Sequence, residues 1–471
     1  MIHNKNYIGK KGYAINKTGL SPLEMEKIKS KLLVRPCTGL QSNKFGNSNK
    51  DGSESQFPIY RESTKKLYVP RYFGIENFGE CEMKSISLFE PIDIPFEGSL
   101  RENQVPVVDA YFQELSKPCK GGGLLELECA YGKTVIALNI ISRLKAKTLV
   151  IVHKEFLMNQ WIERINQFLP SARIGKIQGK IMDIEDKDIV IGMLQSLSMK
   201  TFPENTFQSF GLTVVDECHH ISSEVFSCAL FNIVTQYTLG LSATMERKDG
   251  TSYVIKMFLG GICFVGRNVE KHNVLVKGIT FIEKDDHKFN EVCVDYRGNV
   301  QYSKMISKLC EFNPRSDFIV DVVCDMVLKN PEQQIMILAH NKSLLTYLFG
   351  SIQSRDVCTV GYYVGGMKKD ALKESESKTI IIATFSMASE ALDIKTLTSL
   401  VMATPKTDIE QSVGRILRQK HSQPVIIDII DSHPPFKNQW AKRKTFYRNK
   451  GYTITETNSI SYFEKEKKMI K

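Results

Sequence analysis

Two kinds of apolar pattern alternate along most of the chain. From Leu124 onward, longer amphipathic stretches separate short apolar runs such as LLELE, TLVIVH, DIVIGM and LTVVDE. This alternation is typical of βαβ units, whose parallel strands are buried on both faces. It begins again with IMILAH, IIIATF, SLVMAT and VIIDII. The chain is therefore predicted to be an α/β protein with two successive parallel-sheet domains.

The length of the chain also requires more than one domain. A chain of 471 residues exceeds what a single hydrophobic core usually holds. We expect a small N-terminal domain over residues 1–95, a first α/β domain over 96–270 and a second over 271–471. The stretch 41–56 is rich in Asn, Ser, Gly and Lys, so it is predicted to be a flexible insertion.

The net charge of +11 is concentrated at the two ends of the chain. Residues 1–50 hold ten Lys/Arg and two acidic residues, a net charge of +8. Residues 431–471 hold ten Lys/Arg and four acidic residues, a net charge of +6, so the remainder is slightly acidic. Basic ends suit a polyanionic partner, because each phosphate contact releases counterions. The alternative is that the basic ends, including the C-terminal tail, only promote solubility.

Other compositional features exclude several classes of protein. No apolar run approaches the roughly 18 residues of a membrane helix. The N-terminus lacks the apolar segment of a signal peptide. The 11 cysteines include no CxxC pair, so neither a zinc site nor a disulfide framework is indicated. We expect a protein that is kept inside a cell, is not secreted and has no membrane partner.

A phosphate-binding loop is predicted at Gly132, Lys133 and Thr134. The segment LELECAYGKTVIALNIISRL has the pattern of a strand, a loop and a helix. In such a loop, backbone N–H groups cradle phosphates, the lysine reaches the β and γ groups, and the hydroxyl binds Mg²⁺. The usual pattern has glycine where this chain has Leu127, and often also where it has Ala130. By itself, the short GKT segment is also compatible with an ordinary loop.

Two adjacent carboxylates at the end of a predicted strand strengthen the interpretation. LTVVDECHH ends an apolar run with Asp216 and Glu217. Buried neighbouring carboxylates are costly without a cation or another partner. Asp216 can hold Mg²⁺, and Glu217 can accept a proton from an attacking water. The alternative is that the pair only caps the helix that follows.

A third segment, QSVGRILR, predicts a helix that carries Gln411, Arg415 and Arg418 near one face. Arginines delivered from a second domain can stabilise the transition state of phosphoryl transfer. A solvated basic helix face is the alternative interpretation.

Together these segments resemble a helicase family. DECH (216–219), SAT (242–244) and QSVGRILR (411–418) resemble motifs II, III and VI of superfamily 2 helicases, in the same order. HKEFLMNQW (153–161) and ATFSMASEALDIK (383–395) resemble further motifs. The resemblance spans about residues 100–420 and implies two tandem RecA-like domains, an ATPase activity, and ATP and Mg²⁺ as cofactors.

The resemblance also assigns roles to single residues. In LRENQ, Arg101 and Gln104 correspond to the adenine-recognising segment, and Asp393 to a further ATP contact. His219, Ser242 and Thr244 are expected to couple ATP chemistry to the rest of the motor. The residues expected to contact the nucleic-acid backbone are His153, Gln160, Gln195, Ser196 and Thr384.

Within the superfamily, the chain is most similar to the XPB-like group, especially the type encoded by large nucleocytoplasmic DNA viruses, such as the poxvirus transcript-release helicase. LGLSATMERKDG and ATPKTDIEQSVGRILR carry this likeness. It implies a DNA-dependent ATPase or helicase in viral transcription or repair, with single-stranded or duplex DNA and the transcription machinery as partners. A cytoplasmic or virion-associated location is expected. The group has an Arg-Glu-Asp element where this chain has Arg247, Lys248 and Asp249.

Two other functions are the alternatives. An RNA helicase of the DEAD-box kind would show DEAD, PTRELA and a histidine at the start of motif VI, whereas this chain has DECH, HKEFLMNQW and Gln411. DNA is therefore favoured as the track. A nucleic-acid-binding scaffold that has lost catalysis would explain the missing loop glycines, but the predicted catalytic residues are all present. Polarity, strand separation and oligomeric state stay open.

Overall fold

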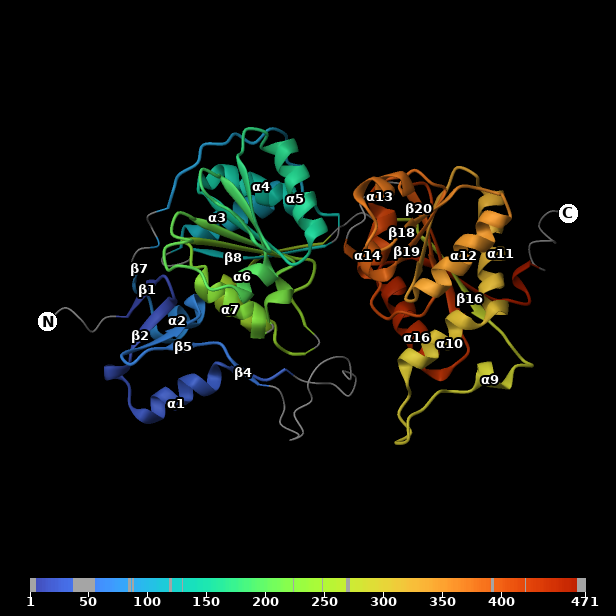
Figure 1. Ribbon diagram of the computed structural model, residues 1–471, viewed down its shortest axis with the longest axis horizontal. Coiled ribbons are helices and arrows are strands. Elements are labelled where there is room, and N and C mark those ends of the chain that lie inside the picture. Colours follow the sequence, from blue (N-terminus) through green and yellow to red (C-terminus); the bar gives the residue numbers. More distant parts are fainter. Residues whose placement is uncertain are drawn as a thin grey trace. The chain divides into compact units, whose positions relative to one another are not determined.

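The computed structural model divides into two compact units, residues 1–268 and 269–471 (Figure 1). The predicted flexible insertion at 41–56 lies outside the described residues except for Gln56. The residues that the structure describes are 6–36, 56–83, 86, 89–117, 121–128, 130–222, 224–247, 249–267, 272–390, 394–419 and 421–463.

The first unit begins with a small five-stranded sheet and two helices. Its strand order is β5-β6-β2-β1-β7, antiparallel except for the β1–β7 pair. Ser21 and Glu24 form a capping box that starts the first helix, α1. The elements are β1 (Tyr7–Gly9), β2 (Gly12–Asn16), η1 (Lys17–Gly19), α1 (Pro22–Lys31), β3 (Leu33–Val34), β4 (Phe57–Pro58), β5 (Arg61–Glu62), β6 (Lys66–Val69), α2 (Arg71–Phe78) and β7 (Glu82–Met83).

The N-terminal sheet is docked on the α/β domain that follows it. The buried Arg71 donates to the backbone oxygens of Thr235 and Gln236, at 3.3 and 2.7 Å. The hydroxyls of Tyr72 and Thr238 lie 3.1 Å apart. The apolar residues of the sheet belong to the same buried cluster as one face of the large sheet. Because a core is shared, residues 6–267 pack as one unit.

The large sheet of the first unit has eight strands in the order β11-β10-β12-β9-β13-β14-β8-β15. All neighbours are parallel except β11, which pairs antiparallel with β10. The elements are α3 (Val105–Leu115), β8 (Gly122–Leu127), α4 (Lys133–Leu144), β9 (Thr148–Val152), α5 (Glu155–Phe168), β10 (Ile174–Gln178), β11 (Ile181–Asp183), β12 (Ile189–Met193), α6 (Leu194–Met199), β13 (Leu212–Asp216), η2 (Cys218–Ser222), α7 (Glu224–Asn232), β14 (Tyr237–Ser242), α8 (Ser252–Leu259) and β15 (Ile262–Gly266).

Helices cover both faces of this sheet, which explains the continuous apolar runs of its strands. Leu125 and its face pack against α3, α4 and α5. Leu124 and the opposite face pack against α6, α7 and α8 (Figure 1). Successive residues of a strand point to opposite faces, so a strand between two helical layers must be apolar at nearly every position.

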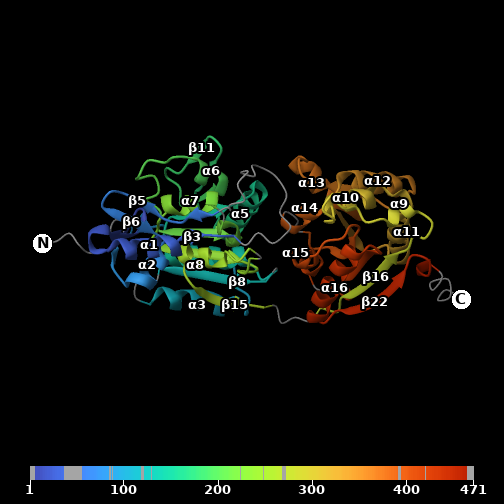
Figure 2. The same ribbon diagram turned by 90° about the horizontal axis from the view of Figure 1, so that it is seen from below.

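The second unit has a seven-stranded sheet in the order β18-β19-β17-β20-β21-β16-β22, and every pair is parallel. Helices α10, α11 and α12 pack on one face, and α14, α15 and most of α16 pack on the other (Figure 2). The elements are β16 (Leu275–Phe281), α9 (His287–Asn290), α10 (Tyr302–Glu311), α11 (Asn313–Lys329), β17 (Gln334–Ala339), α12 (Lys342–Ser354), β18 (Val360–Tyr363), α13 (Lys369–Ser375), β19 (Ile380–Thr384), α14 (Phe385–Glu390), β20 (Leu397–Met402), α15 (Glu410–Val413), η3 (Gly414–Leu417), β21 (Val425–Asp431), α16 (Pro434–Asn449) and β22 (Thr453–Asn458).

The expected α/β class with parallel-sheet domains is thus confirmed. Among the described residues, none of the helices combines the length and the apolar character needed to cross a membrane.

Two ion pairs are sealed inside the second unit, both at carboxylates of β21. Arg315 pairs with Asp431 at 2.6 Å, and Arg443 pairs with Asp428 at 2.7 Å, with all four side chains essentially inaccessible to solvent. Each arginine approaches its carboxylate with two nitrogens. Tyr447 also donates to Asp428, at 3.0 Å. These contacts tie α11 and α16 to the strand between them.

Arg315→Met is expected to destabilise the second unit by about 3–5 kcal/mol, because Asp431 stays buried without its cation. Lys329→Met is the matched control, since its pair with Asp325 is partly exposed and should contribute no more than about 1 kcal/mol. Each unit holds one tryptophan, so urea unfolding followed by fluorescence in a Trp161→Phe background reports on Trp440 alone. Equal losses of stability in the two variants would contradict the prediction.

Candidate functional site

The sequence motifs of the first unit converge on one edge of its sheet. Strands β12, β9, β13, β14 and β8 are consecutive neighbours and all parallel, so their carboxyl ends share this edge. Asp216 pairs in register with Leu241, and Ser242 pairs with Glu126. The predicted phosphate loop, the DECH segment and the SAT segment therefore lie side by side, although they are far apart in sequence.

The loop before α4 has the backbone that a phosphate site requires. Gly132 has φ 88° and ψ 38°, and helix α4 begins at the next residue, Lys133. A Cβ on Gly132 would lie only 2.3 Å from Nε2 of Gln104 and 2.8 Å from a nitrogen of Arg101. The left-handed conformation therefore favours glycine, and a Cβ here would also displace the ends of these two side chains. Ala130, where related loops often have glycine, also has a left-handed φ of 65°.

Arg101 and Gln104 hold the backbone of this loop. The Gln104 side chain donates to the backbone oxygen of Tyr131 at 2.9 Å and accepts from the backbone N–H of Arg101 at 3.0 Å. Arg101 donates to the Ala130 oxygen at 3.1 Å. The Tyr131 hydroxyl donates to the Asn103 oxygen at 3.0 Å. The two residues expected to recognise adenine thus also shape the loop, and their adenine contact stays a prediction.

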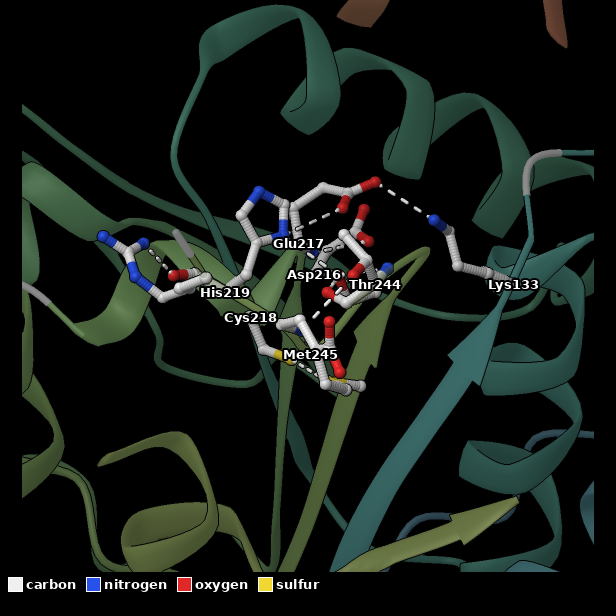
Figure 3. Close-up of polar contacts among 10 residues, drawn as sticks. Lys133, Asp216, Glu217, Cys218, His219, Thr244 and Met245 are labelled. Carbon is white, nitrogen blue, oxygen red and sulfur yellow. Dashed lines mark hydrogen bonds and ion pairs between the residues drawn. The ribbon is translucent and has the colours of Figure 1, made fainter. Parts of the chain in front are cut away.

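Lys133, Asp216 and Glu217 form a compact charged group (Figure 3). Lys133 Nζ lies 3.1 Å from Glu217 Oε1, although the two residues are 84 positions apart. The Trp161 indole donates to Asp216 Oδ2 at 2.9 Å, and the Glu217 backbone N–H donates to Asp216 Oδ1 at 3.0 Å. Trp161 was not among the predicted site residues. Its contact with Asp216 was missed because nothing local in sequence joins α5 to the end of β13.

The two carboxylates have different electrostatic environments. Burial and the neighbouring charge of Glu217 raise the pKa of Asp216 to about 6. Burial also acts to raise the pKa of Glu217, but the charges of Lys133 and His219 outweigh it and lower that pKa below its ordinary value. A buried carboxyl group with a raised pKa is one that a divalent cation would stabilise in its ionised form. Glu217 is ionised and can accept a proton.

His219 connects the DECH segment to the SAT segment. Its Nδ1 lies 2.9 Å from Ser242 Oγ and 3.5 Å from Glu217 Oε2. Ser242 in turn donates to the Thr244 oxygen at 2.6 Å. A displacement of the segment after β14 would therefore shift His219 and change the surroundings of the Glu217 carboxylate.

Arg247 and Asp249 extend this connection, and they were not among the predicted site residues. Arg247 Nε donates to Asp249 Oδ1 at 3.0 Å and to Thr251 Oγ1 at 2.9 Å. The hydrogen bonds from Arg247 lower the pKa of Asp249 to about 2. Arg247 also donates to the backbone oxygen of His219. The Arg-Lys-Asp element in the sequence was the available signal, and its middle residue, Lys248, lies outside the described residues.

Residues expected to contact nucleic acid lie on the same edge. Gln195, after β12, donates to the His153 oxygen at 2.8 Å, and Ser196 accepts from the Gly179 N–H at 3.0 Å. The His153 ring lies 4.1 Å from that of His220, which lies 4.2 Å from that of His219. This row of imidazoles joins the β9–α5 connection to the DECH segment. Gln160 lies in the second turn of α5.

The predicted residues of the second unit lie in three segments. Thr384 ends β19, and its hydroxyl lies 3.2 Å from that of Ser386. Asp393 lies outside the described residues. Gln411 lies in the short helix α15, Arg415 is largely buried in η3, and Arg418 follows η3.

The helix predicted across motif VI is present, but only its first part is α-helical. α15 ends at Val413, and the chain tightens into a 3₁₀ turn from Gly414. Glycine has low helix propensity, and helix ends often tighten in this way.

The arrangement in the first unit suits a nucleoside triphosphate with a divalent cation. The N-terminus of α4, which is its positive end, directly follows Gly132. Because Gly132 has no side chain, a phosphate group could approach the backbone closely there. Lys133 and Thr134 lie in the first turn of that helix, opposite the buried Asp216. A lysine, a hydroxyl, a buried carboxyl group with a raised pKa and a carboxylate with a lowered pKa are therefore grouped at one edge of the sheet.

Comparisons with known proteins place this site in a family. The family model described as Type III restriction enzyme, res subunit, matches residues 97–247. "Putative ATP-dependent RNA helicase L396" of Acanthamoeba polyphaga mimivirus is 32% identical over 458 residues, covering 96% of this chain and 86% of that protein. A protein named as an ATP-dependent RNA helicase in African swine fever virus (isolate Pig/Kenya/KEN-50/1950) is 30% identical over 387 residues, covering 76% of this chain and 74% of that protein.

A solved structure, S. cerevisiae Dbp5 bound to RNA and ADP BeF3, has a TM-score of 0.53 at 13% identity and covers 78% of this chain and 96% of that chain. This likeness concerns the fold, and it confirms the RecA-like character of the parallel-sheet domains. Together with the viral relatives, the site defines a superfamily 2 helicase. The chain belongs to the superfamily 2 helicases of large DNA viruses.

The buried His153 and the half-buried His220 lead us to expect a loss of stability in acid. Burial lowers the pKa of His153 to about 4 and that of His220 to about 3. In the unfolded chain, these imidazoles bind protons below about pH 6.5, so their contribution is intact above that pH and is lost as the pH falls toward 4. His153→Phe keeps an aromatic ring without the titration, and its unfolding free energy should fall less steeply between pH 6.5 and 4.

The control for this experiment is His287→Phe, because His287 is exposed on α9. Its pH dependence in urea unfolding should match that of the unsubstituted chain. If His153→Phe also matched it, the buried imidazole would not be a source of acid sensitivity.

Proposed function

We propose that this helicase hydrolyses ATP to move along or remodel DNA, as an XPB-like motor of viral transcription, in transcript release or termination, or of repair. The convergence of Lys133 with Asp216 and Glu217 carries the proposal. It is supported by the position of the segments expected to bind nucleic acid, on the same sheet edge.

In this proposal, each residue of the charged group has a separate task. Lys133 leaves Glu217 and neutralises the β- and γ-phosphates. Thr134 and Asp216 are the residues that would hold Mg²⁺, whose charge would keep Asp216 ionised despite its burial. Glu217, released from its ion pair with Lys133, then accepts a proton from the attacking water. His219 relays the change in charge to Ser242 and Thr244.

The second unit supplies further groups in the same proposal. Gln411, Arg415 and Arg418 act on the γ-phosphate, and Asp393 adds an ATP contact. Charge from arginine at the transferring phosphate stabilises the transition state. Closure with ATP and opening after hydrolysis would change the grip on the track in each cycle.

Different observations favour DNA and RNA as the nucleic acid along which the helicase moves. DECH, HKEFLMNQW and Gln411 favour DNA, because the DEAD-box kind of RNA helicase differs in all three. RNA is the second candidate, because the viral relatives are named as RNA helicases. On either track, His153, Gln160, Gln195, Ser196 and Thr384 are the proposed backbone contacts.

Lys133→Ala and Glu217→Gln should separate ATP binding from hydrolysis. Lys133→Ala should lower ATP turnover by about 10²–10³-fold, because an electrostatic contact to the phosphates is lost. Glu217→Gln should bind ATP and Mg²⁺ nearly as tightly as the unsubstituted chain and yet not hydrolyse ATP. Steady-state ATPase rates and the binding of a fluorescent ATP analogue would measure both. Full turnover in Lys133→Ala would remove the basis of the proposal.

The track is identified by the ATPase rate without polymer and with single-stranded DNA, duplex DNA or RNA of one base sequence. Stimulation by DNA well above that by RNA is expected. Stimulation by RNA alone would replace the DNA assignment with the RNA one. A rate that no polymer changes would contradict both.

A further inference from the structure

A small hairpin projects from the second unit between α9 and α10 (Figure 1). It comprises residues 292–301 and is called the 292–301 hairpin here. It exposes three apolar side chains: Val294 at 52%, Tyr296 at 87% and Val300 at 43% of their full accessible surface. Tyr296 lies at the tip, in the sequence Asp-Tyr-Arg-Gly-Asn. An exposed tyrosine between two exposed valines favours contact with a ligand over simple solvation.

The tip of the hairpin is held in one conformation. The backbone N–H of Asp295 donates to the Asn299 oxygen at 2.8 Å, and that of Gly298 donates to the Asp295 oxygen at 3.0 Å. The Asp295 carboxylate accepts from the N–H groups of Arg297 and Asn299, at 2.8 and 2.9 Å. Gly298 has φ 80°, which a three-residue hairpin loop requires at this position. Tyr296 is thus presented on a preorganised turn.

The base of the hairpin is attached to the body of the second unit. The Cys293 N–H lies 3.1 Å from the sulfur of the buried Met305. The Gln301 N–H donates to the Cys293 oxygen at 2.8 Å. The Tyr302 hydroxyl donates to the Pro405 oxygen at 3.0 Å. Pro405 belongs to the connection that leads into motif VI, so this hydrogen bond joins the base of the hairpin to that connection.

The charges near the tip suit a polyanion that carries flat rings. The Arg297 guanidinium lies 5.1 Å from the centre of the Tyr296 ring. Lys304 is exposed in the first turn of α10, beside the hairpin. The partly exposed carboxylate of Asp295 accepts hydrogen bonds from two backbone N–H groups and so holds the turn that presents Tyr296 and Arg297. An aromatic ring, an arginine and a nearby lysine can bind a base and its phosphate together.

We propose that the 292–301 hairpin is a binding site for an unpaired nucleobase of the track, which stacks on Tyr296 while Arg297 and Lys304 attract the backbone. This inference rests on the proposed function for the presence of a track. Stacking needs only one exposed ring, whereas a stable protein partner needs about 800 Å² on each side, far more than one tyrosine and two valines offer.

The test is the binding of the full-length chain to a single-stranded oligonucleotide that carries 2-aminopurine, in deoxyribose and ribose versions of one sequence. Stacking quenches the fluorescence of this base. Tyr296→Leu keeps an apolar side chain and removes the ring, so affinity should fall about tenfold and quenching should be lost. Tyr296→Phe should keep both. Arg297→Ala should weaken binding with a smaller loss of quenching.

Tyr253→Leu is the matched control, because Tyr253 is an exposed tyrosine on α8 of the first unit. It should bind as the unsubstituted chain does. The ATPase rate without polymer should be unchanged in all these variants. Unchanged affinity and quenching in Tyr296→Leu would overturn the inference, and binding in only one sugar series would identify that track. If the unsubstituted chain bound neither oligonucleotide, the proposed function itself would fail.

Discussion

The parallel pairing of β8, β14 and β13 is the constraint on which the site depends. It brings the carboxyl ends of three strands to one edge, so that Lys133 meets Glu217 across 84 positions. Ser242 lies on the strand between them and reaches His219. A slip of one residue in this register would turn the strands' apolar side chains to the other helical layer. The burial of these strands between two helical layers therefore also fixes the relative positions of Lys133, Ser242 and Glu217.

Buried charge is used differently in the two units. In the second unit, Arg315 and Arg443 satisfy Asp431 and Asp428 completely, and these pairs tie helices to the sheet. In the first unit, Asp216 is also buried, but an indole and a backbone N–H are its hydrogen-bond donors among the described residues, and its pKa is raised. A fully paired carboxylate stabilises the fold. A buried carboxyl group that has a raised pKa and lies beside the predicted phosphate loop is suited to binding a cation.

Much of this arrangement was predictable from local sequence. The apolar runs indicated parallel strands under two helical layers, and both large sheets have that form. The GKT and DECH segments were placed at strand ends, where the structure has them. Motif VI was predicted less well, because Gly414 ends the α-helix and the periodicity of the side chains did not reveal the 3₁₀ turn.

The sequence by itself determined the fold class, the segments that carry the chemistry and the order in which they occur, because these depend on short-range periodicity and on residue type. Only the tertiary structure decided the partners of these segments. Trp161 at Asp216, Arg247 at the His219 oxygen and Gln104 at the phosphate loop join segments that no local pattern connects. Such contacts arise from strand order and helix packing, which are set by the burial of the whole sheet and not by the residues near each motif.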